Sequence, residues 1–320
     1  MFDDSFHFRF GRFFSLSSLA AAVCVAGCGG GGGDPGPPLT TADGRPVVFA
    51  SVAPIAGLVE RLAGGKVEVR TLAAAGQDPH GFSPTPKQVV ELSRSWAFFV
   101  VGVPFEAPLL EKIDDSAARL SIVNVAAGLD LLANAEEEED HDAHAEDDHH
   151  DHHHHGEAGD PHIWLSPPLL KTEAKTIVAA LSRIAPEHAA VFGENLARFE
   201  AETDALHAEL TAKLAPHRGQ RFYVFHGAFA YFARAYGLEQ AAIEIAGRGP
   251  EPKRLFAIVE RAKADGVKIV FVQPQFDQKS ARTLAESIGG SVVAIDPMEK
   301  DVLENLRHLA DSIGGALKKP

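Results

Sequence analysis

The residues Pro186 to Leu214 read P-E-H-A-A-V-F-G-E-N-L-A-R-F-E-A-E-T-D-A-L-H-A-E-L-T-A-K-L. Their apolar side chains recur at helical spacing, which predicts one uninterrupted amphipathic helix. Roughly 28 residues at the α-helical rise make about 40 Å, enough to cross a whole molecule. We therefore predict that residues 186–216 form a long, rigid helix that joins two lobes. The apolar residues that define its face are Val191, Phe192, Leu196, Phe199, Leu206, Leu210 and Leu214.

The chain before this helix, residues 46–185, alternates short apolar runs with helical stretches. Ala97 to Val101 is a continuous apolar run, which is typical of parallel strands that are buried on both faces. Pro84-Thr85-Pro86 indicates a helix start, because proline is tolerated in a first helical turn. These patterns predict an N-terminal α/β lobe. Strands are expected at 47–50, 67–72, 97–101 and 121–125, and helices at 54–63, from 84–86 to 93, from about 106, and at 168–184.

The chain after the helix, residues 217–320, repeats the same alternation and predicts a second lobe of four strands and four helices. The fold class is therefore α/β, with two lobes of four β-α repeats, each on a parallel sheet, joined by the long helix. Strands are expected at 221–225, 241–245, 267–272 and 291–295, and helices at 228–236, 251–264, 278–288 and 301–317.

The N-terminus has the pattern of a segment for export. Arg9 and Arg12 precede an uncharged apolar stretch that is too short for a stable membrane anchor, so we predict a signal peptide over 1–28. The stretch ends Val25-Ala26-Gly27-Cys28, which resembles a bacterial lipobox, with Cys28 as the lipidated residue; a plain signal peptide cleaved near Ala26 is the alternative. Residues 29–45, rich in Gly and Pro, are then a flexible tether.

The negative charge of the chain is concentrated in one segment. The formal charge is −14, but 12 of the 44 acidic residues lie in residues 136–160, and the remainder has 30 basic and 32 acidic residues. No basic stripe is present, so we expect no nucleic-acid partner. Residues 136–159 have no apolar side chain larger than Ala and are predicted to be a disordered insertion in the first lobe.

The insertion offers imidazoles and carboxylates at high density, which favours weak binding of additional Zn²⁺. A passive, solvated run of charge is the alternative. The auxiliary ligands expected here are His141, His144, His149, His150, His152, His153, His154 and His155.

Four other residues form a candidate set of ordered metal ligands. His80 and His162 each close an Asp-Pro-His tripeptide, His226 follows the strand predicted at 221–225, and Asp296 follows the strand predicted at 291–295. Ligands of open α/β sheets bind beyond the carboxyl ends of strands. Three imidazoles and one carboxylate would make a closed four-coordinate zinc site. The alternatives are ordinary loop histidines and, for Asp296, a helix N-cap.

The surroundings of these ligands also carry expectations. Asp78 and Asp160 are expected to cap turns or to orient the histidine that follows them. Four aromatic residues are candidates for walls of the site, with ordinary core packing as the alternative for each: Phe82, Trp164, Phe225 and Phe229. Four further histidines are expected at the solvated surface: His188, His207, His217 and His308.

In four motifs the chain resembles the metal-specific solute-binding proteins of bacterial ABC importers: Asp78 to Pro86, Asp160 to Pro167, Phe222 to His226, and Gln273 to Phe276 with Asp296-Pro297. The resemblance covers 46–317 and implies two lobes bridged by a rigid helix with the metal between them. It implies the ligands His80, His162, His226 and Asp296, and a histidine at the third position is typical of zinc members. At positions 273 and 227 the chain has Gln273 and Gly227, where members of that family often have an acidic residue.

The function implied is capture of Zn²⁺ in the periplasm or cell envelope and delivery to an ABC permease and its ATPase, by a lipid-anchored monomer. No catalysis is expected, because a closed ligand shell leaves no position for an activated water. A zinc hydrolase is the weaker alternative, since no His-Glu-x-x-His helix is present. A zinc-holding surface adhesin is another. Binding at the ordered site and at the insertion is expected to weaken below about pH 6.5.

Overall fold

The computed structural model describes residues 36–113, 119–133, 159–244, 252–276 and 278–317, apart from the side chains of Pro252, Arg254 and Ser280. All of these lie in one compact unit, Asp34–Pro320. The predicted signal peptide, Cys28 and the eight auxiliary histidines lie outside the described residues. Among the helices that are described, none combines the length and apolar character needed to cross a membrane.

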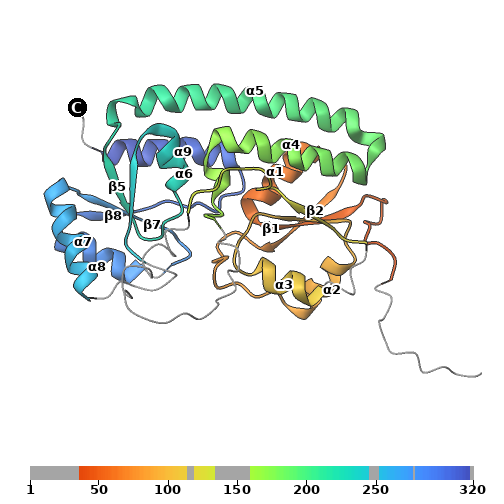
Figure 1. Cartoon of the computed structure of the whole chain (residues 1–320), viewed down its shortest axis with the longest axis horizontal. Coiled ribbons are helices and arrows are strands. Elements are labelled where there is room, and N and C mark those ends of the chain that lie inside the picture. Colours follow the sequence, from red (N-terminus) through yellow and green to blue (C-terminus); the bar gives the residue numbers. More distant parts are fainter. Residues whose placement is uncertain (1–35, 114–118, 134–158, 245–251, 277, 318–320) are drawn as a thin grey trace, which may run out of the picture. The chain divides into compact units, whose positions relative to one another are not determined.

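The first sheet consists of four parallel strands in the order β2-β1-β3-β4. Every residue of β1 and β3 is buried, which explains why these strands appear in the sequence as continuous apolar runs. Helix α1 lies on one side of the sheet, and α2 and α3 lie on the other (Figure 1). The elements are β1 (Val47–Val52), α1 (Ala53–Ala63), β2 (Glu68–Ala73), α2 (Pro86–Ser93), β3 (Ala97–Val100), α3 (Glu106–Ile113) and β4 (Ser121–Asn124).

The predicted start of α2 is confirmed by a reciprocal cap. The Thr85 side chain accepts a hydrogen bond from the backbone N–H of Gln88, and the Gln88 side chain accepts one from the backbone N–H of Thr85. Two backbone donors that have no partner within the helix are thereby satisfied. The cap fixes where the chain turns into α2 after the loop that contains His80.

Helix α5 joins the two lobes, as predicted. It runs from Ala189 to Leu214 after a short 3-10 turn, η2 (Pro186–His188). It packs against α1 and α4 along one part of its length and against α6 and α9 along the other (Figure 1). Its buried residues include Phe192, Phe199 and Leu206, all from the predicted apolar face. The other elements of this region are η1 (Ile163–Leu165), α4 (Pro167–Ile184) and η3 (Ala215–His217).

Ion pairs fasten α5 along its solvent-facing side. Each exposed pair contributes little stability, but together the pairs reach α1 and α4 of one lobe and α9 of the other. The connection between the lobes is therefore held at several points along one helix. The pairs are Arg61–Glu202, Lys171–Asp204, Lys175–Glu200, Lys213–Asp311 and Arg307–Glu209.

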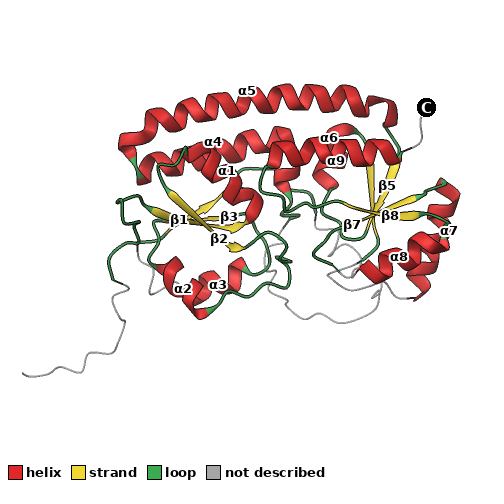
Figure 2. Cartoon of the chain, turned by 180° about the vertical axis from the view of Figure 1, so that it is seen from behind, coloured by secondary structure: helices red, strands yellow, loops and turns green. Residues whose placement is uncertain are grey.

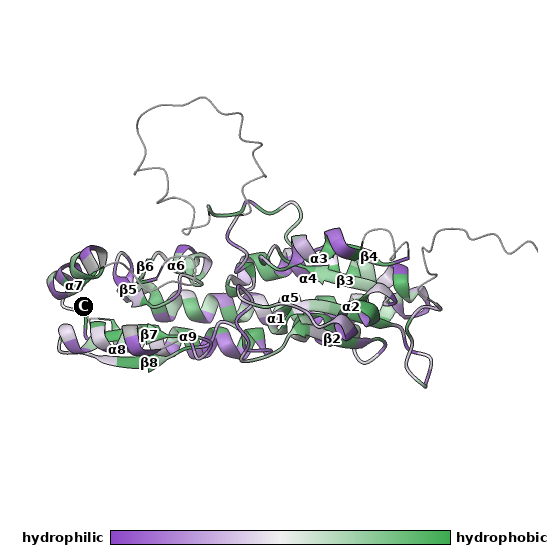
Figure 3. Cartoon of the chain, turned by 90° about the horizontal axis from the view of Figure 1, so that it is seen from below, coloured by the Kyte–Doolittle hydropathy of each residue, from purple (hydrophilic) through white to green (hydrophobic). Residues whose placement is uncertain are grey.

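The second sheet has the order β6-β5-β7-β8, again parallel, so both lobes share one topology (Figure 2). Figure 3 shows β7 and β8 as mainly hydrophobic. One hydrophobic core continues from the first lobe through α4 and α5 to α6 and α9, and a smaller one lies beneath α7 and α8. The elements are β5 (Arg221–Val224), α6 (Ala230–Tyr236), β6 (Glu239–Ala242), α7 (Pro252–Asp265), β7 (Ile269–Val272), α8 (Gln278–Ser287), β8 (Ser291–Ala294) and α9 (Val302–Ala316).

Two segments differ from the sequence-based expectation. Strand β6 begins two residues before the predicted 241–245, because Glu239 already pairs with Arg221; Glu244 therefore follows the strand instead of lying within it. Part of the predicted tether is also attached to the first lobe. Leu39 bonds through its backbone to Arg94 and Val47, and Thr40 forms a β-bridge with Pro46.

A close approach between the lobes occurs at Gly57 of α1. A Cβ atom there would lie 2.0 Å from the carbonyl oxygen of Lys300, which precedes α9. The Lys300 ammonium also pairs with Glu60 of α1 at 2.7 Å. Only glycine fits at position 57, so the segment between β8 and α9 is held against the first lobe.

We expect Gly57→Ala to lower the free energy of unfolding by about 2 kcal/mol, the usual cost of overpacking. Gly193→Ala is the matched control, because Gly193 is exposed in α5 and a Cβ there has open space. This control should stabilise the protein by about 0.5–1 kcal/mol through helix propensity. Urea denaturation measures both, and equal effects of the two substitutions would contradict the close approach.

Candidate metal centre

His80 lies in the loop between β2 and α2. The Asp78 carboxylate accepts a hydrogen bond of 2.9 Å from the backbone N–H of His80, which makes a tight turn across Pro79. Asp78 thus caps the turn, as predicted. The His80 side chain is only partly buried, yet its Nε2 atom is buried and lacks a hydrogen-bond partner among the described residues. This nitrogen is placed as a ligand atom would be.

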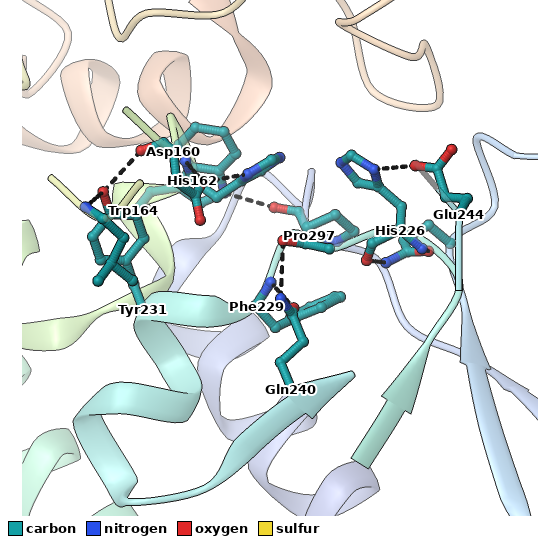
Figure 4. Close-up of polar contacts among 12 residues, drawn as sticks. Asp160, His162, Trp164, His226, Phe229, Tyr231, Gln240, Glu244 and Pro297 are labelled. Carbon is teal, nitrogen blue, oxygen red and sulfur yellow. Dashed lines mark hydrogen bonds and ion pairs between the residues drawn. The ribbon is translucent and has the colours of Figure 1, made fainter. Parts of the chain in front are cut away.

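His162 is the N-cap residue of η1 and is buried. One oxygen of Asp160 accepts from the His162 backbone N–H at 2.9 Å and lies 2.7 Å from His162 Nδ1 (Figure 4). The prediction that Asp160 orients the histidine is confirmed. A carboxylate at Nδ1 favours the tautomer with the proton on that nitrogen, so Nε2 is left as the acceptor and potential ligand.

His226 follows β5 and is also buried. Its Nδ1 lies 2.5 Å from the Glu244 carboxylate, and Figure 4 shows this pair on the opposite side of the site from Asp160 and His162. The buried Gln273 side chain accepts from the His226 N–H at 3.1 Å and donates to the His226 carbonyl at 2.8 Å. Both the ring and the backbone of His226 are therefore fixed.

The three imidazoles converge. Each offers one ligand atom, and these atoms all lie within 4.8 Å of one another. The ring centroids are 4.7 Å apart for His80 and His226, 5.3 Å for His162 and His226, and 5.7 Å for His80 and His162. In a tetrahedral zinc site with Zn–N bonds near 2.1 Å, ligand atoms are about 3.4 Å apart. The cluster is close to that spacing and would contract around an ion.

The space at this cluster is small and largely enclosed by apolar groups. The cavity measures about 10 Å³ and is lined by Pro79, the three histidines, Gln275, Phe276, Pro297 and Met298. Phe276 stacks on the His226 ring at 4.7 Å, and Trp164 packs edge-on against His162 at 5.4 Å. Of the four predicted wall residues, only Trp164 has such a ring contact with a candidate ligand among the contacts described.

Asp296 lies beside the cavity but is not part of the three-histidine cluster. Its Oδ1 accepts hydrogen bonds from the Gln275 side chain at 2.7 Å and from the Met298 N–H at 2.8 Å. The helix cap considered as its alternative role belongs to Asp301, whose side chain accepts from the Glu304 N–H at the start of α9. The structure thus brings three of the four predicted ligands together.

Burial strongly lowers the pKa of two of the candidate ligands, His80 and His226. Desolvation and then the neighbouring imidazoles His226 and His162 lower the pKa of His80 to about 3, and desolvation and then His162 lower that of His226 to about 3. Both rings are therefore neutral at and well below neutral pH, which is the state that binds a metal ion. The sequence predicts that zinc binding weakens below about pH 6.5. For His80 and His226 the lowered pKa values move this weakening to a lower pH.

Sequence reasoning missed three residues that shape the centre. The apolar pattern predicts Glu244 inside a strand, although in a parallel sheet a carboxylate just beyond the neighbouring strand is the signal for such a partner. Gln273 was noted only as a departure from an acid. Phe276 belongs to one of the four motifs, but the motif does not predict that its ring stacks on His226.

Comparisons with known proteins agree with this architecture. A family model described as zinc-uptake complex component A, periplasmic, matches residues 48–316. A protein of Treponema pallidum (strain Nichols) described as metal-binding is 31% identical over 272 residues, covering 84% of this chain and 84% of that protein. The zinc-binding protein AdcA of Streptococcus pyogenes (serotype M3) is 30% identical over 264 residues, covering 81% of this chain and 51% of AdcA; the chain spans about half of that relative.

Solved structures are similar over most of the chain. The crystal structure of ZnuA has a TM-score of 0.75 at 33% identity, covering 85% of this chain and 99% of ZnuA. A zinc-bound ZnuA deletion mutant also has a TM-score of 0.75 at 33% identity, with 86% and 99% covered. The laminin-binding protein Lmb of Streptococcus agalactiae, described as an adhesin with metal transporting activity, has a TM-score of 0.72 at 25% identity, with 85% and 100% covered.

The pKa values predict an acid-tolerant site. Because the pKa values of His80 and His226 are about 3, protons do not compete at these rings at pH 5.5. Three ordinary imidazoles would lose roughly a thousandfold in metal affinity between neutral pH and pH 5.5. We expect a far smaller loss, measured by chelator competition with Zn²⁺ on a variant that lacks residues 136–157. A thousandfold loss would show that all three rings titrate normally.

Glu244→Gln should weaken zinc binding about 10–100-fold, the usual effect of removing a group that orients a ligating histidine. The amide keeps the size of the side chain but no longer supplies the carboxylate that fixes the His226 tautomer. Glu239→Gln, at the other end of β6 and exposed, is the matched control and should leave the affinity unchanged. Competition titration by isothermal calorimetry measures the zinc affinity of both variants. Equal affinities would show that Glu244 does not contribute to zinc binding through His226.

Proposed function

The chain belongs to the family of zinc-uptake complex component A proteins, and on that basis we propose that it captures Zn²⁺ and delivers it to an ABC importer. The observation that carries the proposal is the convergence of His80, His162 and His226 from both lobes on one enclosed point. Proteins of this family are periplasmic or extracellular solute-binding proteins that work with a permease and an ATPase; they are not enzymes.

The chemistry of the ligands supports zinc as the cargo. Neutral imidazoles suit Zn²⁺, whereas Mg²⁺ and Mn²⁺ favour sites richer in oxygen ligands. The carboxylates at Nδ1 of His162 and His226 increase the basicity of the rings and point the other nitrogen toward the centre. The small cavity of about 10 Å³ between the histidines has room for an ion held by its ligands.

Asp296 is proposed as the fourth ligand. Its bonding partners Gln275 and Met298, together with Pro297, line the cavity, so its carboxylate is bonded to the wall of the cavity. A carboxylate would complete a tetrahedral shell and offset part of the charge of the ion. The segment that holds it is docked on the first lobe through the Trp164 side chain, which donates to the Pro297 carbonyl at 2.8 Å.

The remaining parts of the proposal concern residues that the structure does not describe. The export signal over 1–28 and lipidation of Cys28 would place a monomer at the surface of a membrane, within reach of its permease. The histidines of residues 136–159 would bind additional Zn²⁺ weakly and raise its concentration close to the ordered site. Support for both comes from the sequence pattern alone.

A competitive titration of Zn²⁺ against Mn²⁺ tests the proposal. We expect one tight zinc site in the purified protein that survives removal of residues 136–157, because the three ordered histidines remain. His226→Ala should weaken that site by a hundredfold or more, since it removes one direct ligand, and Asp296→Ala should weaken it less. His217→Ala, outside the cluster, is the control and should bind as the unmodified protein does.

The possible results separate the alternatives. Loss of all tight binding on removal of residues 136–157 would make the insertion the receptor and would refute the ordered site. Equal affinity for Mn²⁺ and Zn²⁺ would refute the assignment of the cargo. An affinity unchanged by Asp296→Ala would limit the protein ligands to the three histidines.

A further inference from the structure

The two chain segments that flank residues 134–158 meet at the base of this insertion. The Asp160 N–H donates to the Leu132 carbonyl at 2.8 Å. A Cβ atom on Gly159 would lie 2.5 Å from Leu131 Cβ and 2.9 Å from the Leu132 carbonyl oxygen, so only glycine allows this approach. The base of the insertion, defined here as Leu131–Leu132 and Gly159–Asp160, is therefore closely packed.

A hydroxyl group from the second lobe closes this base. Tyr231 lies in α6, and its oxygen accepts a hydrogen bond of 3.0 Å from the Leu132 N–H and donates one of 2.8 Å to the Asp160 carbonyl (Figure 4). The side chain is 1% exposed, and burial raises the pKa of Tyr231 to about 12, so the hydroxyl stays protonated. Both flanking segments are bonded to one oxygen atom.

The same contact leads directly to the metal centre. Asp160 receives the Tyr231 bond at its carbonyl, and its carboxylate holds both the backbone N–H and the Nδ1 of His162. Tyr231 itself lies five residues after His226, on the segment that leaves β5. It therefore connects the chain that carries a ligand of the second lobe to the residue that orients a ligand of the first.

We propose that Tyr231 is a positioning residue of the zinc centre: it ties the base of the insertion to Asp160 and thereby fixes the orientation of His162. The inference rests on the proposed function as a zinc-capturing protein. Without the hydroxyl, the part-buried Leu132 N–H and the buried Asp160 carbonyl lose their shared partner, and buried polar groups rarely remain without one. Asp160 would then move with the chain that enters the insertion, and His162 would lose its fixed direction.

The length of the insertion explains why the base needs the hydrogen bonds of Tyr231. Twenty-five residues, 134–158, separate the two flanking segments in sequence, and a long connection holds its ends together less well than a short one. A direct linker of a few residues between Ala133 and Gly159 would hold the base closed covalently. The contribution of Tyr231 to zinc binding should therefore depend on the length of this connection.

The experiment is a cycle of four proteins: the unmodified protein, Tyr231→Phe, a variant with residues 134–158 replaced by Gly-Ser, and the combination of both. We expect Tyr231→Phe to weaken zinc binding about tenfold in the full-length insertion background, because His162 is less well oriented. In the short-linker background the same substitution should weaken zinc binding less than threefold. Chelator competition with Zn²⁺ measures all four affinities.

A second measurement distinguishes a positioning role of Tyr231 from a general loss of stability. In the metal-free protein, long-range ¹H–¹⁵N NMR spectra should show His162 as a single tautomer protonated at Nδ1, and as a mixture in Tyr231→Phe. Tyr236→Phe is the matched control: it lies in the same helix and is 3% exposed, and its hydroxyl lies 3.4 Å from His207. This control should change neither the zinc affinity nor the His162 tautomer.

Two results would overturn the inference. One is an unchanged zinc affinity in Tyr231→Phe, and the other is an equal loss in both backgrounds, which would mean that the hydroxyl acts through overall stability. Failure of the proposed function is distinguishable from both, because it would appear as the absence of a tight, His226-dependent zinc site in the unmodified protein.

Discussion

The arrangement of the centre depends on burying neutral imidazoles against carboxylates. Removing His80 and His226 from water keeps their pKa values far below the ordinary range, so nitrogen lone pairs face the cavity instead of protons. Burial alone would leave the rings free to turn. Asp160 and Glu244 prevent this for His162 and His226 by bonding to Nδ1. Each carboxylate also contributes negative charge beside the three-histidine cluster.

This constraint explains what the rest of the fold does. The three histidines and Asp296 each come from a different segment. To form the proposed site, segments of both lobes would have to be held to within a fraction of an ångström. Helix α5, with packing and ion pairs on both lobes, supplies that rigidity along one side. The Trp164–Pro297 bond and the contact of Gly57 with Lys300 supply it closer to the centre. The lobes are therefore joined at more than the connecting helix.

The sequence predicted most of this because periodicity and motif position are local signals. All eight strands and the long helix follow from apolar runs and helical spacing, and His80, His162 and His226 follow from their placement beyond strands or before a helix. The position of Glu244 was not predictable from the sequence because it depends on the register between strands. The pairing of Glu239 with Arg221 ends β6 early and places Glu244 at the His226 ring, and no local pattern encodes that pairing. Asp160 was predictable since its partner is two residues away; Tyr231, its other partner, is 71 residues away.

The three histidines of the cluster are not held equally. His162 and His226 are buried, and each has a carboxylate at Nδ1; among the described contacts, the ring of His80 has no such partner, and its side chain is the least buried. Ligand atoms within 4.8 Å of one another must close to about 3.4 Å around zinc. Since α5 and the contacts at Trp164 and Gly57 hold the two lobes against each other, we infer that the loop that carries His80 would make this adjustment. In the proposed function, His162 and His226 would be the fixed pair that receives Zn²⁺, and the less buried His80 would complete the contact.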